Sequence, residues 1–135
     1  MTAVGGQPEH GIDRLRTPRD FRRVYDEGRR HVADLFVLYR RPLPGPARVG
    51  ISVGRRVGTA VVRNRVRRRV REILRHIPLG RCQEVVVVVR PQAARADFAA
   101  LRSQLEALVR ESGALRAPSE GRGRAEGDDG RSGGS

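Results

Sequence analysis

The chain has 135 residues, enough for one folded domain with tails. Its 28 basic residues, all of them arginine, outnumber 15 acidic ones, and the net charge of +13 favours a polyanionic partner such as RNA or DNA. The single cysteine excludes an internal disulfide, and the lack of a long apolar run or a signal-peptide pattern predicts a cytoplasmic protein without membrane contact.

Both ends of the chain are predicted to lie outside the folded domain. Residues 1–12 contain three glycines and no apolar periodicity, which is typical of a flexible segment. Residues 114–135 are rich in glycine, serine and arginine and predict a disordered tail. Four arginines and four acidic residues cancel within this tail, so the excess positive charge belongs to the rest of the chain. We therefore predict one folded domain over residues 13–113.

The first predicted helix begins after Thr17, a residue type that caps helices, and has Pro18 at its first position. It ends near Gly28. Three large side chains recur within it at helical spacing and share one face: Phe21, Val24 and Tyr25.

Two β-strands are predicted next. Residues 31–40 are β-prone and alternate, so Leu35, Val37 and Tyr39 should point to one side of a sheet and Phe36 and Leu38 to the other. A turn rich in proline and glycine follows. The second strand has apolar side chains at every other position: Val49, Ile51 and Val53.

The segment after this strand carries the densest positive charge, with six arginines within residues 63–71. Apolar residues recur there at spacings of three and four: Val62, Val66, Val70, Ile73, Leu74 and Ile77. This period predicts an amphipathic helix with one face in a core and an arginine-rich face outside. Thr59 is a plausible cap, and Pro78 and Gly80 end the helix.

Five consecutive valines at positions 85–89 predict a strand buried on both faces. A last helix is predicted over residues 97–111, ended by Gly113, with one apolar face: Phe98, Leu101, Leu105, Leu108 and Val109. The element order α-β-β(-β)-α-β-α predicts an α/β (α+β) two-layer sandwich, in which three helices pack on a small mixed sheet.

The sequence offers no recognisable catalytic or metal-binding set. Protein-only hydrolysis of RNA usually needs paired histidines or a carboxylate cluster that holds a metal ion. The three histidines lie far apart in the sequence, and the aspartates of the domain are spread singly. We therefore expect neither catalytic residues nor a metal site in this chain.

Two groups of residues favour RNA binding. The guanidinium groups of the arginine-rich helix, with Arg55 and Arg56 before it, suit phosphates, although exclusive use of arginine also fits a genome-wide compositional bias. Asn64 both donates and accepts hydrogen bonds. Aromatic side chains beside basic ones suit the stacked bases of single-stranded RNA. Phe21 is the ambiguous member, because it fits a core position as well as a stacking position.

Several sequence blocks together resemble the protein subunit of bacterial ribonuclease P, the ribonucleoprotein that trims precursor tRNA. They run in the family's order from about residue 14 to 109. The blocks are Arg14-Leu15-Arg16 with Asp20-Phe21, Phe36-Val37-Leu38-Tyr39, Arg48-Val49-Gly50-Ile51-Ser52-Val53 and Ala60-Val61-Val62-Arg63-Asn64-Arg65-Val66-Arg67-Arg68. The last block contains the Arg-Asn-Arg signature of the family.

The resemblance implies a sandwich with an unusual left-handed crossover through the arginine-rich helix. It implies that catalysis belongs to a partner RNA, which uses Mg²⁺ to leave the mature 5′ end of tRNA, and that no protein partner is required. The expected contacts to this catalytic RNA are Arg55, Arg56, Arg63, Asn64, Arg65, Arg67, Arg68 and Arg71. A cleft between the first helix and the sheet is expected to hold the single-stranded 5′ leader of precursor tRNA, lined by Arg14, Phe21, Tyr25, Val37 and Tyr39.

The chain departs from the family pattern in two places. Gly54-Arg55-Arg56 stands where Ser-Lys-Lys is common, which keeps the charge and loses a hydroxyl, and Tyr25 stands where phenylalanine is frequent. Two alternatives stay open. A generic RNA-binding module would bind RNA without rescuing precursor processing, and an autonomous nuclease would cleave RNA without a partner.

Overall fold

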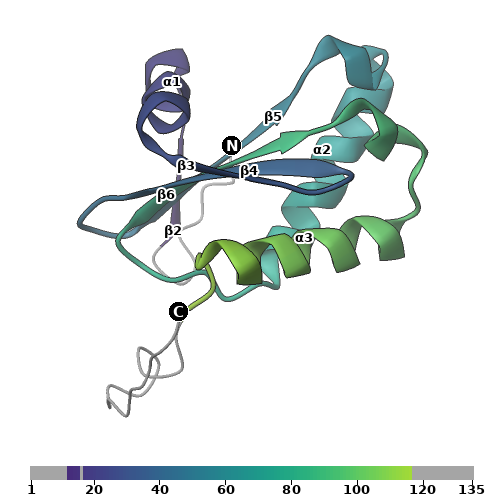
Figure 1. Cartoon of the computed structure of the whole chain (residues 1–135). Helices are drawn as coiled ribbons and strands as arrows, with labels where there is room; N and C mark the ends of the chain where they lie inside the picture. The colour runs from purple at the N-terminus through teal and green to yellow at the C-terminus, as the bar shows by residue number, and fades with distance from the viewer. Residues whose placement is uncertain (1–11, 16, 117–135) are drawn as a thin grey trace.

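A mixed five-stranded sheet runs through the described part of the chain, residues 12–15 and 17–116 (Figure 1). Its order is β2-β5-β6-β4-β3. The parallel pairs are β2 with β5 and β5 with β6, and the antiparallel pairs are β4 with β6 and β3 with β4. The strands are β2 (Ile12–Arg14), β3 (Arg29–Val32), β4 (Phe36–Pro42), β5 (Ala47–Val53) and β6 (Gln83–Val89).

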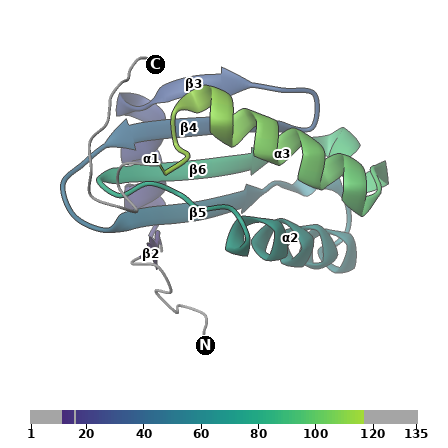
Figure 2. The same cartoon turned by 90° about the horizontal axis from the view of Figure 1, so that it is seen from below.

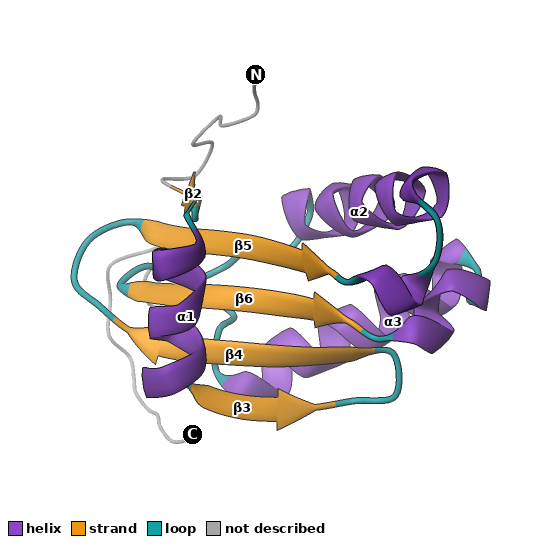
Figure 3. Cartoon of the chain, turned by 90° about the horizontal axis from the view of Figure 1, so that it is seen from above, coloured by secondary structure: helices purple, strands orange, loops and turns teal. Residues whose placement is uncertain are grey.

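Helix α1 (Pro18–Glu27) forms because both of its ends are satisfied locally. The Thr17 hydroxyl accepts a hydrogen bond from the Asp20 N–H at 3.1 Å, and the Gly28 N–H donates to the Val24 carbonyl at 2.8 Å. The helix lies crosswise over the strands on one face of the sheet (Figure 3). The predicted start and end of this helix are confirmed.

Helices α2 (Ala60–Arg75) and α3 (Phe98–Ser112) cover the opposite face of the sheet (Figure 2). Thr59, the predicted cap of α2, accepts from the Val62 N–H at 3.3 Å. Asp97 caps α3 by accepting from the Ala100 N–H at 2.8 Å. Two short 3₁₀ helices, η2 (Arg55–Val57) and η3 (Pro91–Arg95), follow β5 and β6. Within the described ranges, no helix is long and apolar enough to cross a membrane.

The parallel strands β5 and β6 are joined through α2. In Figure 2, α2 lies on the viewer's side of the sheet, both strands point to the right, and β6 lies above β5. A chain that follows this route makes a left-handed crossover, whereas nearly all such connections are right-handed. The picture therefore agrees with the crossover that the family resemblance implied.

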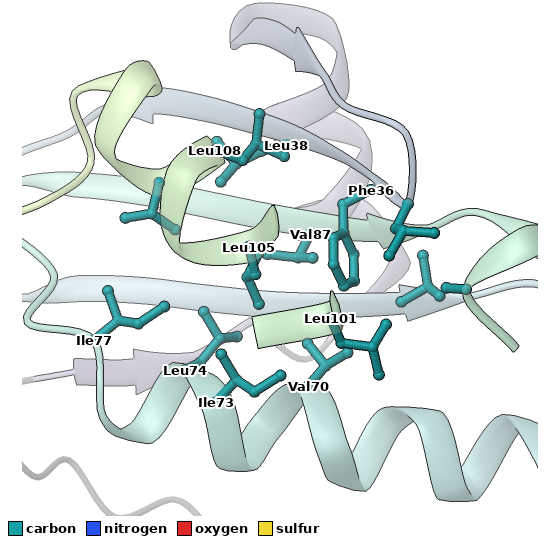
Figure 4. Packing of buried hydrophobic residues seen from close by; sticks show 14 of the residues in the cluster. Phe36, Leu38, Val70, Ile73, Leu74, Ile77, Val87, Leu101, Leu105 and Leu108 are labelled. Carbon is teal, nitrogen blue, oxygen red and sulfur yellow. The ribbon is translucent and has the colours of Figure 1, made fainter. Parts of the chain in front are cut away.

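The main core lies between the sheet and the helices α2 and α3 (Figure 4). Burying one large apolar side chain of this kind contributes about 1.5–3 kcal/mol. Buried members include Val66, Val70, Ile73 and Leu74 of α2, Leu101, Leu105, Leu108 and Val109 of α3, and Phe36, Leu38, Val85, Val87 and Val89 of the sheet. On the other face, Val86 is buried under α1, which confirms that the valine strand is buried on both sides.

The α+β class, with three helices on a mixed sheet, is confirmed, but three details differ from the prediction. The strand expected over residues 31–40 is two strands, β3 and β4, separated by a turn. Leu35 lies in that turn and packs in the main core with Phe36 and Leu38, rather than beside Val37. Phe98 is 40% exposed, because α3 begins at this residue and its first turn extends past the core.

The described structure also extends past both predicted domain ends. Strand β2 begins at Ile12, inside the segment expected to be flexible. At the other end, Ala114 is buried and its carbonyl accepts from the Gly80 N–H at 2.9 Å, while Arg116 donates its N–H to the Pro78 carbonyl at 2.7 Å. The remaining parts of the predicted flexible segments, residues 1–11 and 117–135, lie outside the described residues.

Candidate nucleic-acid interface

The arginine surface consists of the eight residues predicted to contact RNA: Arg55 and Arg56 of η2, and Arg63, Asn64, Arg65, Arg67, Arg68 and Arg71 of α2. Helix α2 turns Val66, Val70, Ile73 and Leu74 into the core, so its polar residues face outward. Asn64, Arg65 and Arg68 are exposed, and the other three on this helix are half-buried. The structure thus brings the predicted residues to neighbouring turns of one segment.

Two members of the arginine surface are held by local hydrogen bonds. The Arg67 Nη1 donates to the Asn64 Oδ1 at 2.8 Å, and the Arg63 Nε donates to the Gly58 carbonyl at 3.2 Å. The Asn64 amide oxygen is therefore engaged within α2. Its NH₂ group can still donate to a partner, because the residue as a whole is exposed.

Positive charge is concentrated around Arg71. Burial lowers the pKa of the Arg71 guanidinium, and the charges of Arg14, Arg67 and Arg75 lower it further. Like charges this close repel one another, so an approaching phosphate would relieve the repulsion.

Arg14 belongs to this charged neighbourhood rather than to the aromatic residues with which it was grouped. It pairs in register with Val49, whose side chain packs against the main core on the α2 side of the sheet. The structure therefore does not bring Arg14 together with the other four residues of the predicted leader cleft.

Those four residues form the aromatic surface: Phe21 and Tyr25 of α1, and Val37 and Tyr39 of β4. The ring centroids of Phe21 and Tyr25 are 6.4 Å apart, and those of Tyr25 and Tyr39 are 4.9 Å apart with the rings edge to face. Val37 lies two residues before Tyr39 on the same face of the strand. All four side chains are half-buried, so they combine fixed positions with accessible apolar area.

Phe21 has features of both predicted positions, one in a core and one on an accessible surface. It packs against the small cluster of Leu15, Val24 and Val86 beneath α1, yet it remains partly exposed. The ring lies close to the sheet because Gly50 is underneath: a Cβ there would be only 2.6 Å from the Phe21 Cζ atom. The ring is thus supported from below and accessible at its outer side.

A set of charged residues beneath α1 was not predicted. Glu84 of β6 is 1% exposed and accepts hydrogen bonds from the Arg41 Nη1 at 2.7 Å and the Arg48 Nη1 at 2.9 Å. The Arg41 Nε also contacts a Glu27 oxygen at 2.8 Å, and the Arg48 Nη2 contacts an Asp20 oxygen at 3.1 Å. The only sequence signal was a glutamate beside the valine run, in a strand expected to be buried.

The pKa values of this set reflect the ion pairs. Burial tends to raise the pKa of Asp20, but the Arg48 guanidinium and hydrogen bonding to Thr17 outweigh it, so that the pKa lies below its ordinary value. The hydrogen bond to Glu84 raises the pKa of Arg41, and Glu27 adds to this effect against the opposing effect of burial. Asp20 and Arg41 therefore stay ionised at neutral pH.

The described residues do not form a metal site of their own. Among residues 12–15 and 17–116, no three His, Cys, Asp or Glu side chains are grouped so that they could hold a metal ion. The carboxylates beneath α1 face guanidinium groups, which take the oxygen positions that Mg²⁺ would need.

Comparison with known proteins identifies the family. A family model described as Ribonuclease P matches residues 11–113. The ribonuclease P protein component of Dictyoglomus thermophilum is 38% identical over 109 residues, which is 77% of this chain and 91% of that protein. This chain belongs to the ribonuclease P protein family. The ribonuclease P protein component of Xylella fastidiosa is also 38% identical, over 104 residues, which is 76% of this chain and 77% of that protein.

Solved structures of ribonuclease P proteins share the fold. The protein from Thermotoga maritima matches with a TM-score of 0.64 and 35% identity over 73% of this chain and 96% of that one. The protein from Staphylococcus aureus matches with a TM-score of 0.65 and 26% identity over 76% of this chain and 97% of that one. The chain is thus the protein subunit of ribonuclease P, the endoribonuclease of tRNA 5′ processing, and it partners ribonuclease P RNA. This confirms the predicted family over the two alternatives.

Proposed function

We propose that this ribonuclease P protein binds the catalytic RNA through its arginine surface and the 5′ leader of precursor tRNA through its aromatic surface. The observation that carries the proposal is the division of these residues between two faces of one sheet (Figure 3). Guanidinium groups lie on α2, and the rings lie on α1 and β4. One protein of this shape can contact two RNA molecules at once.

The aromatic surface suits the leader because a single strand presents unpaired bases. Stacking of one base on an aromatic side chain is worth about 1–3 kcal/mol and tolerates any base identity. The edge-to-face contact between Tyr25 and Tyr39 leaves ring area half-exposed for such stacking. A leader-containing precursor would then bind better than mature tRNA, which lacks the leader.

We place the phosphodiester hydrolysis in the partner RNA, with Mg²⁺ bound mainly by that RNA. The arrangement of carboxylates supports this proposal, because those beneath α1 serve arginine side chains. When bound, the ion would supply charge stabilisation and an activated water. The role of this chain is to hold the two RNA molecules in position.

The test is cleavage of precursor tRNA at low Mg²⁺ concentration by the protein alone, by ribonuclease P RNA alone, and by the two together. We expect efficient cleavage only from the mixture. A mixture no better than the RNA alone would contradict the proposal and favour a general RNA-binding role. Cleavage by repurified protein alone would place an active site in this chain.

A further inference from the structure

The charged residues beneath α1 form one row across the three central strands. Arg41 of β4 and Arg48 of β5 are both paired in register with Glu84 of β6, and all three side chains lie on the face that α1 covers. A carboxylate with 1% exposure is costly to bury unless cations and hydrogen bonds compensate it. Here two guanidinium groups do so, one from each side.

Each arginine in the row also holds α1. The Arg48 Nη1 contacts Glu84 while its Nη2 contacts Asp20, and the Arg41 Nη1 contacts Glu84 while its Nε contacts Glu27. Because a guanidinium group is planar and rigid, two bonds to one group fix the separation of the two carboxylates. Asp20 and Glu27 are seven residues apart, about 10 Å along the helix axis. The buried Glu84 carboxylate therefore holds both ends of the helix, through Arg48 at one end and Arg41 at the other.

This row lies directly beside the aromatic surface. Tyr39, Val86 and Gly50 occupy the next row on the same face, two residues along each strand. Phe21 and Tyr25 lie between the two anchored positions of α1. A shift or tilt of α1 would consequently change the 4.9 Å separation between the Tyr25 and Tyr39 rings and the seating of Phe21 over Gly50.

We propose that Glu84 is a positioning residue for leader binding: by holding Arg41 and Arg48 it fixes α1 over the sheet and so sets the geometry of the aromatic surface. Glu84 itself is too deeply buried to touch RNA. The inference rests on the proposed function, which assigns the leader to that surface.

The experiment compares Glu84→Gln with the wild type in holoenzyme reconstituted with ribonuclease P RNA. The measured quantity is the affinity for precursor tRNA divided by the affinity for leaderless tRNA. We expect Glu84→Gln to reduce this ratio by about two- to thirtyfold, the range found for residues that act on a site through a contact network. Glu106→Gln is the matched control, since it removes the same charge on α3, where Glu106 pairs with Arg102 at 3.2 Å, and should leave the ratio unchanged.

A second measurement reports the surface without RNA. The sequence has two tyrosines, Tyr25 and Tyr39, and both belong to the aromatic surface. Incorporated 3-fluorotyrosine therefore gives ¹⁹F NMR signals from this surface alone. We expect these signals to shift in Glu84→Gln and to stay in place in Glu106→Gln. Unmoved signals in folded Glu84→Gln would overturn the positioning role.

Tyr25→Ala separates failure of this inference from failure of the proposed function. If Tyr25→Ala lowers the ratio and Glu84→Gln does not, the positioning role is wrong while the leader site stands. If neither lowers it, both are wrong.

An equal loss of affinity for both RNAs in Glu84→Gln would show a general structural role and overturn the inference. Should Glu84→Gln fail to fold, Asp20→Asn with Glu27→Gln releases α1 and keeps Glu84; an unchanged ratio there would overturn it as well.

Discussion

Phe21 lies against the sheet because the residue beneath it has no side chain. A Cβ at position 50 would be 2.6 Å from the Phe21 ring and 3.2 Å from the Leu15 Cβ. Gly50→Ala should therefore displace the ring and lower the free energy of unfolding by about 1–3 kcal/mol, as overpacking does. Urea unfolding followed by circular dichroism measures this change.

Gly54→Ala is the matched control for this substitution. No atom lies within 4 Å of a Cβ built at Gly54, and its φ of −81° suits any residue. Its urea midpoint should stay at the wild-type value. An equal midpoint for Gly50→Ala would mean that Phe21 is not tightly seated over Gly50.

Residue by residue, the sequence predicted what depends on spacing and missed what depends on register. Phe21 and Tyr25 share a helix face at four-residue spacing, so their pairing was predictable. Arg14 and Glu84 depend on which strand lies beside which. The pairing of Arg14 with Val49, and of Glu84 with Arg41 and Arg48, joins positions more than thirty residues apart, and no local pattern reports it.

The same contrast holds for the elements. Helices α1, α2 and α3 were predictable because their caps are local: each capping side chain bonds a backbone N–H three residues on. The division of the predicted strand into β3 and β4 was not, because distant side chains hold the intervening turn. Gln104 accepts from the Leu35 N–H at 2.9 Å, and Arg90 donates to the Ala33 carbonyl at 3.0 Å.

Helix α2 can lose exposed arginines without losing its core face, so the role in RNA binding that we propose for it can be tested separately from folding. Arg65→Ala with Arg68→Ala should weaken binding to ribonuclease P RNA. If both contact phosphates, each lost contact should reduce the slope of log affinity against log salt concentration by about 0.7–0.9. Titrations at several salt concentrations give both quantities.

The matched control for α2 is the double variant Arg102→Ala with Arg110→Ala, which removes two exposed arginines from α3. It changes the net charge by the same amount and should affect the slope much less. Equal effects of the two double variants would indicate that total charge, rather than the arginine surface, governs assembly.

In the whole molecule, each face of the sheet combines a packing role with the RNA-binding role that we propose for it. Helix α2 closes the main core with one side and presents guanidinium groups with the other. Helix α1 covers a small cluster and presents rings, and it is anchored by ion pairs instead of a large apolar interface. In this chain of net charge +13, the buried apolar side of α2 is thereby kept apart from the exposed positive charge on its other side.

The stability of the whole domain should fall on acidification, because two groups bind protons less readily when folded. Burial lowers the pKa of His31 below 6.5, and Arg29 and Arg40 lower it further against the opposing effect of Glu111. The pKa of Asp20 likewise lies below 3.8. For both groups the unfolded chain takes up more protons, so their stabilisation is complete above the unfolded pKa and is lost as pH falls through the folded pKa.

The loss of stability caused by His31 occurs at higher pH than the loss caused by Asp20, so it can be tested alone. Its Nε2 atom is buried without a hydrogen-bond partner in the described structure, so protonation of the ring would place a positive charge beside Arg29 and Arg40 that Glu111 offsets only in part. We expect the free energy of unfolding, measured in urea from pH 7.5 to 5, to begin falling near pH 6.5. His31→Gln removes the ring that takes up this proton and should flatten the curve over this range. A variant curve parallel to the wild type would show that His31 does not cause the decline.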